Sequence, residues 1–192
     1  MPQHSPETLA FLRARRSRPA KTLAPPVPGP EEVRELLEIA ARVPDHGKLE
    51  PWRFLVLERR ALERLAGAVR ERGAALGVEA EKIAKMERQC GDADLAVAVV
   101  ASPELSDEIP EGEQLLSAGA ACYGLLTAAL AAGWGANWLT GWAVHDRDFA
   151  ERRLGLTPRE QVAGMIHIGT ETAVPPERPR PDLHRITTWA RE

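Results

Sequence analysis

The uncharged stretch from Gln114 to Val144 is the feature that most restricts how this chain can fold. It is long enough to span a bilayer, which takes about 20 apolar residues. However, it is rich in alanine, carries Ser117, and is broken at Gly133 and Gly135. A helix that is apolar on all sides can equally be the buried centre of a soluble protein or a contact between subunits. We therefore expect a long helix, Gln114 to about Ala132, within the protein and not in a membrane.

The rest of the chain alternates between amphipathic helices and short apolar strands. One helix has apolar residues at positions i, i+3, i+4, i+7 and i+8, which form a single buried stripe: Val33, Leu36, Leu37, Ala40 and Ala41. Buried strands are predicted for three apolar runs: Phe54–Leu57, Leu95–Val100 and Val162–Gly169. Two charged helical regions, Glu58 to about Ala75 and Glu79 to Gln89, separate the first two strands. This order predicts one layered α/β or α+β domain over residues 1–192.

Charge and cysteine content argue against several classes of protein. The net charge is −3, and nucleic-acid binding needs a concentrated basic surface, so no nucleic-acid partner is expected. The two cysteines, Cys90 and Cys122, are far apart and lack metal-ligand spacing. We interpret them as reduced thiols of a cytoplasmic protein. The N-terminus has no basic region leading into an apolar run, so no secretory signal is expected.

The motifs of several catalytic classes are missing. There is no Gly-x-Ser-x-Gly nucleophile elbow, no GxGxxG fingerprint after a strand and no P-loop. The five histidines are isolated from one another and form no HExxH pattern: His4, His46, His145, His167 and His184. We therefore expect neither a metal site nor a nucleophilic side chain.

Two arginine-rich segments, one near each end of the chain, are the strongest candidates for a ligand site. Arg15-Arg16-Ser17 offers fork-shaped donors and a hydroxyl, a combination suited to a phosphate. Arg178 and Arg180 alternate with prolines on a stiff, extended backbone. Each segment alone is also compatible with a solvated basic surface. Together with the proline-bracketed turn from Arg42 to Phe54, they indicate a phosphorylated planar ligand.

The order and spacing of these elements resemble the nitroreductase family, specifically its compact, single-domain branch of FMN-dependent NAD(P)H oxidoreductases. The shared elements, in chain order, are Arg15-Arg16-Ser17, Arg42-x-Pro44-Asp45-His46-x5-Trp52-x-Phe54, a small-residue helix before Gly133, and Ile168-Gly169-Thr170. The similarity covers nearly the whole chain. It implies an α+β fold with a central mixed β-sheet flanked by helices. It also implies an interlocked homodimer with FMN at the subunit interface.

The resemblance implies which residues hold the phosphate end of the cofactor. Arg15, Arg16 and Ser17 match positions that bind the FMN phosphate and the ribityl chain or the adjoining ring edge. The tail that carries Arg178 and Arg180 matches a segment that closes on the phosphate.

Around the flavin ring, the resemblance implies contacts from both subunits. The segment beside the isoalloxazine corresponds to Trp138, Leu139 and Thr140. Arg42 and His46 match positions that reach the flavin from the neighbouring subunit, and Pro44 shapes their turn.

This chain departs from its relatives at two positions near the ring. Glu50 stands where many relatives have glutamine, which would add negative charge near the cofactor, and Leu139 replaces an arginine of some close relatives. Both departures bear on substrate preference more than on FMN binding.

The activity that the resemblance implies is a ping-pong reaction. FMN takes a hydride from NADH or NADPH at flavin N5 and then reduces a small electron-poor acceptor, such as a nitroaromatic compound or a quinone. The protein supplies orientation, positive charge and hydrogen bonds, so no side chain is expected as an acid–base catalyst. Two alternatives stay open. One is a flavin-binding protein with little NAD(P)H turnover, and the other is a helical interaction subunit without a cofactor.

Several other chemically capable residues are better explained by structure. We expect Trp142, His167 and Cys122 in the core or at a subunit contact. His145-Asp146 precedes a short helix that ends near Gly155, so we interpret this pair as a helix cap.

Overall fold

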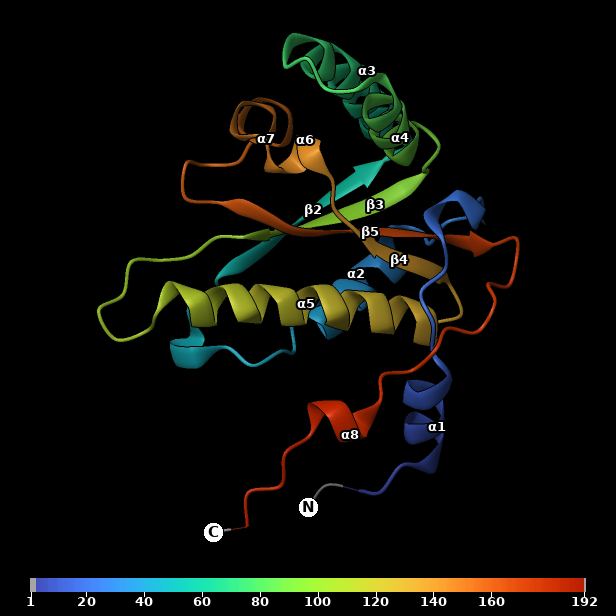
Figure 1. Cartoon of the computed structure of the whole chain (residues 1–192), viewed down its shortest axis with the longest axis vertical. Coiled ribbons are helices and arrows are strands. Elements are labelled where there is room, and N and C mark those ends of the chain that lie inside the picture. The colour runs from blue at the N-terminus through green and yellow to red at the C-terminus, as the bar shows by residue number, and fades with distance from the viewer. Residues whose placement is uncertain (1–2, 192) are drawn as a thin grey trace.

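The computed structural model describes residues 3 to 191, in which one sheet lies between two layers of helices (Figure 1). The five strands are β1 (Leu23–Ala24), β2 (Trp52–Glu58), β3 (Leu95–Ala101), β4 (Gly135–Leu139) and β5 (Gln161–Glu171). Their order is β1-β5-β3-β2, and β4 also pairs with β5. Every pairing between them is antiparallel. The α+β expectation is confirmed, whereas the expectation of a mixed sheet is wrong.

The centre of the sheet is β3, whose seven residues are all buried. A strand covered on both faces has no solvent-facing side that must be polar, which explains its uninterrupted run of leucine, alanine and valine. On one side it pairs with β2, from Trp52 opposite Ala101 to Glu58 opposite Leu95. On the other side it pairs with β5, with a shift in register between Val99 and Val100.

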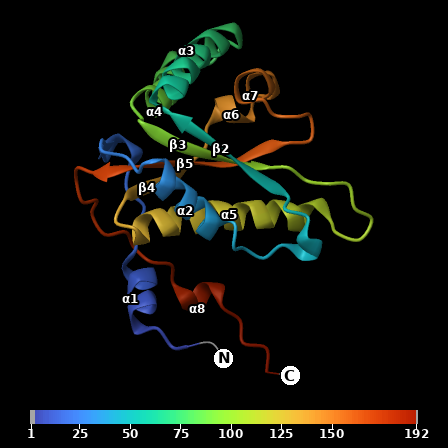
Figure 2. The same cartoon turned by 180° about the vertical axis from the view of Figure 1, so that it is seen from behind.

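Two helical layers cover the sheet, as Figures 1 and 2 show from opposite sides. The α-helices are α1 (Pro6–Ala14), α2 (Pro30–Ala40), α3 (Arg59–Ala75), α4 (Ala80–Gly91), α5 (Glu111–Ala131), α6 (Trp142–His145), α7 (Arg147–Leu154) and α8 (Leu183–Ile186). Two 3-10 turns are η1 (Ala20–Thr22) and η2 (His46–Lys48). One apolar core joins the sheet to α3, α4, α6 and α7, and a second joins it to α2 and α5.

Helix ends follow the local sequence signals. The Ser5 hydroxyl accepts from the backbone N–H of Thr8, and Pro6 opens α1, where its missing N–H is not needed. The Asp146 carboxylate accepts from the N–H of Phe149 at 2.9 Å and so caps α7. That helix ends at Gly155, which has a left-handed φ of 68°. The expected helix cap is therefore Asp146, whereas His145 is the last residue of the preceding helix α6.

The uncharged stretch forms α5 and then β4. Within the described residues, α5 is the one helix long and apolar enough to cross a membrane, and half of its most apolar window is buried in the protein. Cys122 and Leu125 on its inner side are fully buried. On its outer side, Leu116 and Tyr123 are 75% and 45% exposed. The helix therefore contributes to the core along one side and presents apolar residues along the other.

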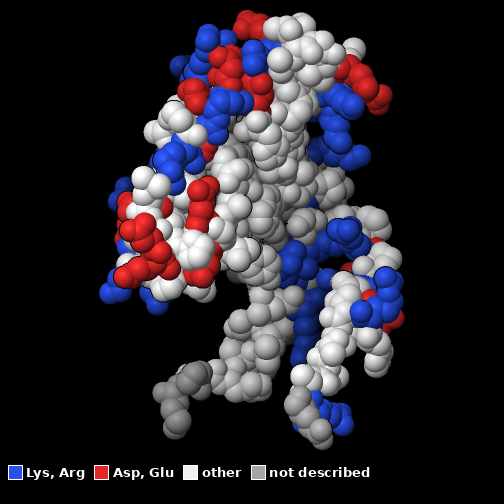
Figure 3. All heavy atoms as spheres, turned by 60° about the vertical axis from the view of Figure 1, so that its left-hand side comes forward, with Lys and Arg blue, Asp and Glu red and all other residues white. Residues whose placement is uncertain are grey.

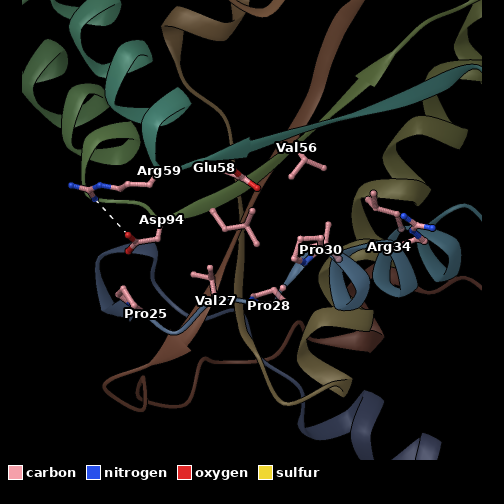
Figure 4. A pocket seen from close by; sticks show the side chains of 13 residues that line it. Pro25, Val27, Pro28, Pro30, Arg34, Val56, Glu58, Arg59 and Asp94 are labelled. Atoms are coloured by element: carbon pink, nitrogen blue, oxygen red, sulfur yellow. Dashed lines mark ion pairs between the residues drawn. The ribbon is translucent and has the colours of Figure 1, made fainter.

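The sheet edge at β2 is open, since no other described strand pairs with its free side. Beside this edge lies a groove of about 630 Å³ between the segment Pro25–Pro30 and β2, with Val27 and Val56 among its lining residues (Figure 4). The ion pair of Arg59 with Asp94, 3.9 Å apart, lies at one end of the groove. No predicted site residue lines it.

Candidate functional site

The segment Arg15–Ser17 leaves α1 and runs to the edge of the sheet at β4. The backbone N–H of Arg18 donates to the carbonyl oxygen of Ala136 at 2.8 Å. The Arg18 guanidinium also pairs with Glu171 of β5 at 3.0 Å. These two contacts fix the segment against β4 and β5, and β4 also carries Trp138 and Leu139, with Thr140 directly after it.

Both arginines of this segment have buried donor atoms that are not satisfied. Arg15 Nε and Arg16 Nη1 are buried and have no hydrogen-bond partner among residues 3–191. The Arg15 guanidinium lies 5.7 Å from the centre of the Tyr123 ring on α5. A buried charged donor without a partner costs free energy, and the oxygens of an anion would remove that cost. The predicted phosphate contacts of Arg15 and Arg16 therefore fit the chemistry of the segment.

The turn between α2 and β2 has a strained backbone. Gly47, Lys48 and Glu50 have φ values of 72°, 57° and 48°, a region that residues other than glycine rarely adopt. The Asp45 carboxylate holds this conformation, because it accepts from the N–H groups of Leu49 at 3.2 Å and Glu50 at 2.8 Å. The side chain of Glu50 is exposed.

The same turn is fastened to the first half of α5. The Ser117 hydroxyl donates to the carbonyl oxygen of Pro44 at 2.7 Å and accepts from the Trp52 indole at 3.0 Å. His46 Nδ1 lies 2.8 Å from a carboxylate oxygen of Glu113. Because Ser117 is buried, these bonds determine where the turn lies along the helix.

Trp138 and Leu139 end β4 and point to opposite faces of the sheet, and Thr140 follows the strand. Trp138 lies opposite Ile166 and Leu139 opposite Met165 on β5. The Trp138 indole covers Gly164, where any side chain would collide with it. This close approach explains why glycine stands in an otherwise apolar strand.

A cavity of about 500 Å³ opens on the face of the sheet that Leu139 occupies. It is lined by residues of η1, α4 and β4 and their flanks: Pro19, Ala20, Lys21, Lys85, Arg88, Gln89, Asp92, Ala93, Asn137 and Leu139. The Nε2 atom of Gln89 is buried there without a hydrogen-bond partner in the described part of the chain. The cavity therefore combines three cationic side chains, the carboxylate of Asp92, two carboxamides and an apolar wall.

Sequence analysis missed most of this cavity. Lys85, Arg88 and Gln89 were interpreted as part of a solvated helical region. Their spacing of i, i+3 and i+4 does put them on one side of α4, but that spacing alone does not identify the element they face. No sequence pattern identified Lys21 as a site residue, apart from its position shortly after Arg15–Ser17.

The structure brings some of the predicted residues together within one chain and leaves others apart. Pro19, which follows the arginine segment, and Leu139 line the same cavity. His46, in contrast, contacts Glu113, whereas Arg15 contacts Tyr123 ten residues further along α5. At a rise of 1.5 Å per residue, this separation is about 15 Å along the helix. His46 therefore lies away from the arginine segment of its own chain, whereas the residues on either side of Arg42, Ala40 and Val43, pack against Gly124 next to Tyr123.

The tail arginines lie beside α1. Arg180 Nη2 donates to the carbonyl oxygen of Arg13 at 3.5 Å, a long contact, and pairs with Glu177 at 2.9 Å. Arg178 is exposed in the same segment. Figure 3 shows basic side chains lining the hollow beside the two projecting terminal segments, and acidic side chains gathered on the other flank.

The large pKa shifts lie outside the arginine segment and the cavity. A hydrogen bond from Arg53 lowers the pKa of Glu160 to about 2, and burial lowers the pKa of His167 to about 4. Burial raises the pKa of the Cys90 thiol to about 11 and that of Cys122 to about 12. The expectation that Cys122 and His167 are buried is confirmed, and Trp142 packs partly buried against the core.

The fold and the site define a class of protein: an α+β chain with an antiparallel sheet, an arginine pair suited to an anion, and a polar cavity between η1, α4 and β4. Comparison with known proteins gives the family. A sequence model described as "Nitroreductase family" matches residues 12–170. A Haemophilus influenzae protein named "Putative NAD(P)H nitroreductase" is 34% identical over 166 residues, covering 85% of this chain and 88% of that protein. An Escherichia coli K12 protein of the same name, YdjA, is 32% identical over 164 residues, with the same two coverages. This chain belongs to the nitroreductase family.

Solved structures with low sequence identity share the fold. A nitroreductase-like family protein from Bacillus cereus superposes with a TM-score of 0.81 at 19% identity, covering 100% of both chains. A nitroreductase with bound FMN from Bacteroides fragilis gives a TM-score of 0.73 at 18% identity, covering 97% of this chain and 100% of the other. The family and the fold expected from the sequence are thus confirmed.

Proposed function

We propose that this chain is an FMN-dependent NAD(P)H oxidoreductase. The observation that carries the proposal is the pair of buried, unsatisfied guanidinium atoms of Arg15 and Arg16. Family relatives are named as NAD(P)H nitroreductases, and a structural neighbour is described with bound FMN. We extend both properties to this chain.

The chemistry of the lining residues suits the two ends of FMN. Arg15, Arg16 and Ser17 would hold the phosphate through charge-assisted hydrogen bonds. The carboxamides of Gln89 and Asn137 each offer a donor and an acceptor, which match the alternating carbonyl and N–H groups on the ring's polar edge. Trp138, Leu139 and Thr140 would then lie along the ring.

The basic residues of the cavity would favour reduction of the bound ring. Lys21, Lys85 and Arg88 line the cavity, and fixed positive charge stabilises the negative charge that develops on a ligand when it accepts electrons. When bound, FMN supplies the redox chemistry, taking a hydride from NADH or NADPH and passing electrons to a nitroaromatic compound or quinone in ping-pong fashion. The protein's contribution is binding, orientation and exclusion of water, so no side chain is proposed as an acid–base catalyst.

The proposal includes an interlocked homodimer in the cytoplasm, with FMN at the subunit interface. In a single chain, His46 lies at the start of α5, away from Arg15. A two-fold axis that packs α5 against a second copy running in the opposite direction would bring the start of one helix to the second half of the other. Arg42 and His46 would then reach the partner's cofactor, with Pro44 fixing their turn.

Two apolar surfaces support this assembly. The first is a groove of about 750 Å³ between α1 and the pair α2 and α5, lined by Phe11, Ile39 and Tyr123 among others. The second is the C-terminal tail, where Ile186 and Trp189 are 66% and 79% exposed. Large exposed apolar residues of this kind mark contact surfaces. The tail of one copy covering the other would also carry Arg178 and Arg180 to the interface.

The direct test is the purified protein's absorption spectrum, followed by anaerobic mixing with NADH or NADPH. The proposal expects a flavin spectrum that bleaches on mixing. Flavin that fails to bleach with either nucleotide would favour the flavin-binding alternative. A protein that binds no FMN even after reconstitution would favour the helical interaction subunit.

A matched pair of variants tests the phosphate contact. Replacing Arg15 and Arg16 together with alanine should raise the FMN dissociation constant at least about tenfold, because two charge-assisted hydrogen bonds are lost. Arg13→Ala is the control, since its side chain is exposed at the end of the same helix. Titration of apoprotein by flavin fluorescence measures both. Equal affinities in the two variants would remove the arginine pair from the site.

A further inference from the structure

In the proposed function His46 contacts the partner's cofactor, and its ring has two nitrogens that could do so. Nδ1 lies 2.8 Å from Oε2 of Glu113, which belongs to the first turn of α5. An ionised carboxylate only accepts hydrogen bonds, so Nδ1 carries the proton that it donates. The other nitrogen, Nε2, has no hydrogen-bond partner among residues 3–191, and 64% of the side chain is exposed. The contact with Glu113 therefore leaves Nε2 as the nitrogen available to a ligand.

The contact between His46 and Glu113 is one part of a two-point attachment of the turn to α5. Ser117 lies one helical turn after Glu113, on the same side of the helix. Its buried hydroxyl donates to the carbonyl oxygen of Pro44 at 2.7 Å. Within the turn, the Asp45 carboxylate holds the backbone that follows His46. Because the chain on both sides of His46 is fixed in this way, the ring stays within reach of Glu113.

A neighbouring loop packs against the same turn. A Cβ atom at Gly47 would collide with Cδ1 of Ile109, so the loop and the turn are in direct contact. The loop is held in turn by Gln114 of α5, a buried residue whose amide donates to the carbonyl oxygens of Glu104 at 3.0 Å and Ile109 at 3.3 Å. The position of His46 relative to α5 is thus determined by several packed segments and not by one exposed contact.

The anchors of His46 and Arg15 on α5 fit a two-fold axis between them. Glu113 holds His46, Tyr123 contacts Arg15, and Gly119 lies between these two anchors. Glycine weakens the interior of a helix, and a Cβ atom at Gly119 would meet nothing within 4 Å in the single chain. The packing of one chain therefore does not require this glycine, whereas the close approach of a second helix would. An axis beside Gly119 would bring His46 of one copy nearly level with Arg15 of the other.

We propose that Glu113 is a positioning residue for the cofactor of the partner subunit: it holds His46 in the form protonated at Nδ1 and so presents the lone pair of Nε2 across the interface. The role rests on the proposed function, because the ligand that Nε2 meets is FMN. An unprotonated Nε2 accepts a hydrogen bond. It therefore suits a donor group of FMN, which the ribityl hydroxyls and the ring N3–H supply, and leaves the phosphate to Arg15 and Arg16.

The first test does not depend on FMN. In apoprotein labelled with ¹⁵N-histidine, at about pH 9, where histidine side chains are ordinarily neutral, His46 should carry its proton on Nδ1. Free histidine prefers the form protonated at Nε2. The His46 signals are identified by their loss in His46→Gln, and Glu113→Ala should move the proton to Nε2. A wild-type ring protonated at Nε2, or a ring that Glu113→Ala leaves unchanged, would overturn the proposal.

The second test measures FMN affinity, for which charge and positioning predict opposite signs. Removal of the Glu113 carboxylate would by charge alone tighten the binding of an anionic ligand. The positioning role instead predicts that Glu113→Ala raises the dissociation constant roughly fivefold to tenfold, the effect of one hydrogen bond. The double variant should bind no more weakly than His46→Ala alone, because Glu113 acts through His46. Glu108→Ala, which removes an exposed carboxylate of the neighbouring loop, measures the effect of charge.

The third test determines which subunit's cofactor Glu113 serves. Mixed dimers are purified through two affinity tags, with Arg15→Ala and Arg16→Ala in one subunit and Glu113→Ala in the other. If Glu113 acts on the partner's cofactor, one site has both defects and the other has none, so half of the sites should bind FMN with wild-type affinity. Two sites that are both weaker than wild type would assign Glu113 to the site of its own chain and overturn the proposal.

The outcomes separate this proposal from the proposed function. A Glu113→Ala variant that folds, as thermal melts check, and binds FMN as tightly as Glu108→Ala would overturn the positioning role while leaving FMN binding intact. A wild-type protein that binds no FMN even after reconstitution would overturn the proposed function and the role of Glu113 with it.

Discussion

The helices on one face of the sheet pair their surface charges with one another, whereas the long helix on the other face has an apolar outer side. On the first face, ion pairs join α3 to α4 and to the region of α7: Arg70 with Glu87, Arg72 with Asp146 at 2.7 Å, and Arg153 with Glu71 at 3.3 Å. On the second face, Leu115, Leu116 and Tyr123 of α5 are 41%, 75% and 45% exposed.

The inner side chains of both helical layers are equally well buried, so the two faces differ only in their outer surfaces. Leu62 on α3 and Leu125 on α5 are both fully buried. The charged face needs nothing further to cover it, whereas the apolar side of α5 exposes side chains that water solvates poorly. A single chain thus completes one face, and in the proposed homodimer a second copy would complete the other. The arginine segment lies at the second face, against Tyr123.

The largest expected effect is a loss of stability on the face covered by α3, α4 and α7, which we call the complete face. Leu62→Ala should lower the free energy of unfolding by about 2 to 5 kcal/mol, because it leaves a cavity in a packed core. This loss should not depend on protein concentration if the face is complete in one chain. Chemical denaturation at two protein concentrations measures it, and Leu76→Ala, at an exposed position after α3, is the control. If the stability loss became smaller at the higher protein concentration, this face would not be complete in a single chain.

The next effect concerns the apolar side of α5. Leu116→Glu should raise the dissociation constant of the dimer at least about 100-fold, equivalent to about 2.7 kcal/mol, because it buries an unpaired charge in the contact. The monomer should fold normally, since Leu116 is exposed there. Leu76→Glu puts the same charge on the other face and should leave the dimer intact. Sedimentation velocity distinguishes them, and a dimer unaffected by Leu116→Glu would refute the assignment of this side as the contact.

The smallest effect is a pH dependence that belongs to the complete face. Arg53 donates to Glu160 at 2.6 Å and lowers the pKa of its carboxyl from 4.5 to about 2. A depressed folded-state pKa contributes stability above pH 4.5 that is lost as the pH falls toward 2. The contribution should be about 1 to 2 kcal/mol, reduced because Arg53 is 39% exposed. Glu160→Gln should lose less stability than the wild type between pH 6 and pH 3, and parallel curves would contradict this.

Much of the secondary structure could be predicted from the chain itself. The apolar stripe from Val33 to Ala41 and the continuous run Leu95–Val100 each correspond to one observed element, because period and length are local properties. The Asp146 cap could also be predicted from the local sequence. The strand β4 was not predicted beyond the break of the uncharged stretch at Gly133 and Gly135, since its pairing with β5 depends on residues nearly thirty positions away.

The residues of the candidate site also fall into two groups: those that the sequence identified and those that it did not. Arg15, Arg16 and His46 stand out because their motifs are contiguous, and the family match supports that interpretation of the sequence. Their roles toward FMN stay predictions. The cavity residues Lys85, Arg88 and Gln89 could not be recognised, because what makes them a site is that α4 packs near β4.

The sequence by itself determined the family, the succession of helices and strands, and the presence of an uncharged helix too apolar to be solvated all round. Only the tertiary structure decided which side of that helix is buried, where the cavity opens, and that His167 lies beside Asn137. The physical reason is that periodicity and capping act within a few residues. A cavity or a cross-strand pair, in contrast, arises from packing between distant segments, which no local pattern encodes.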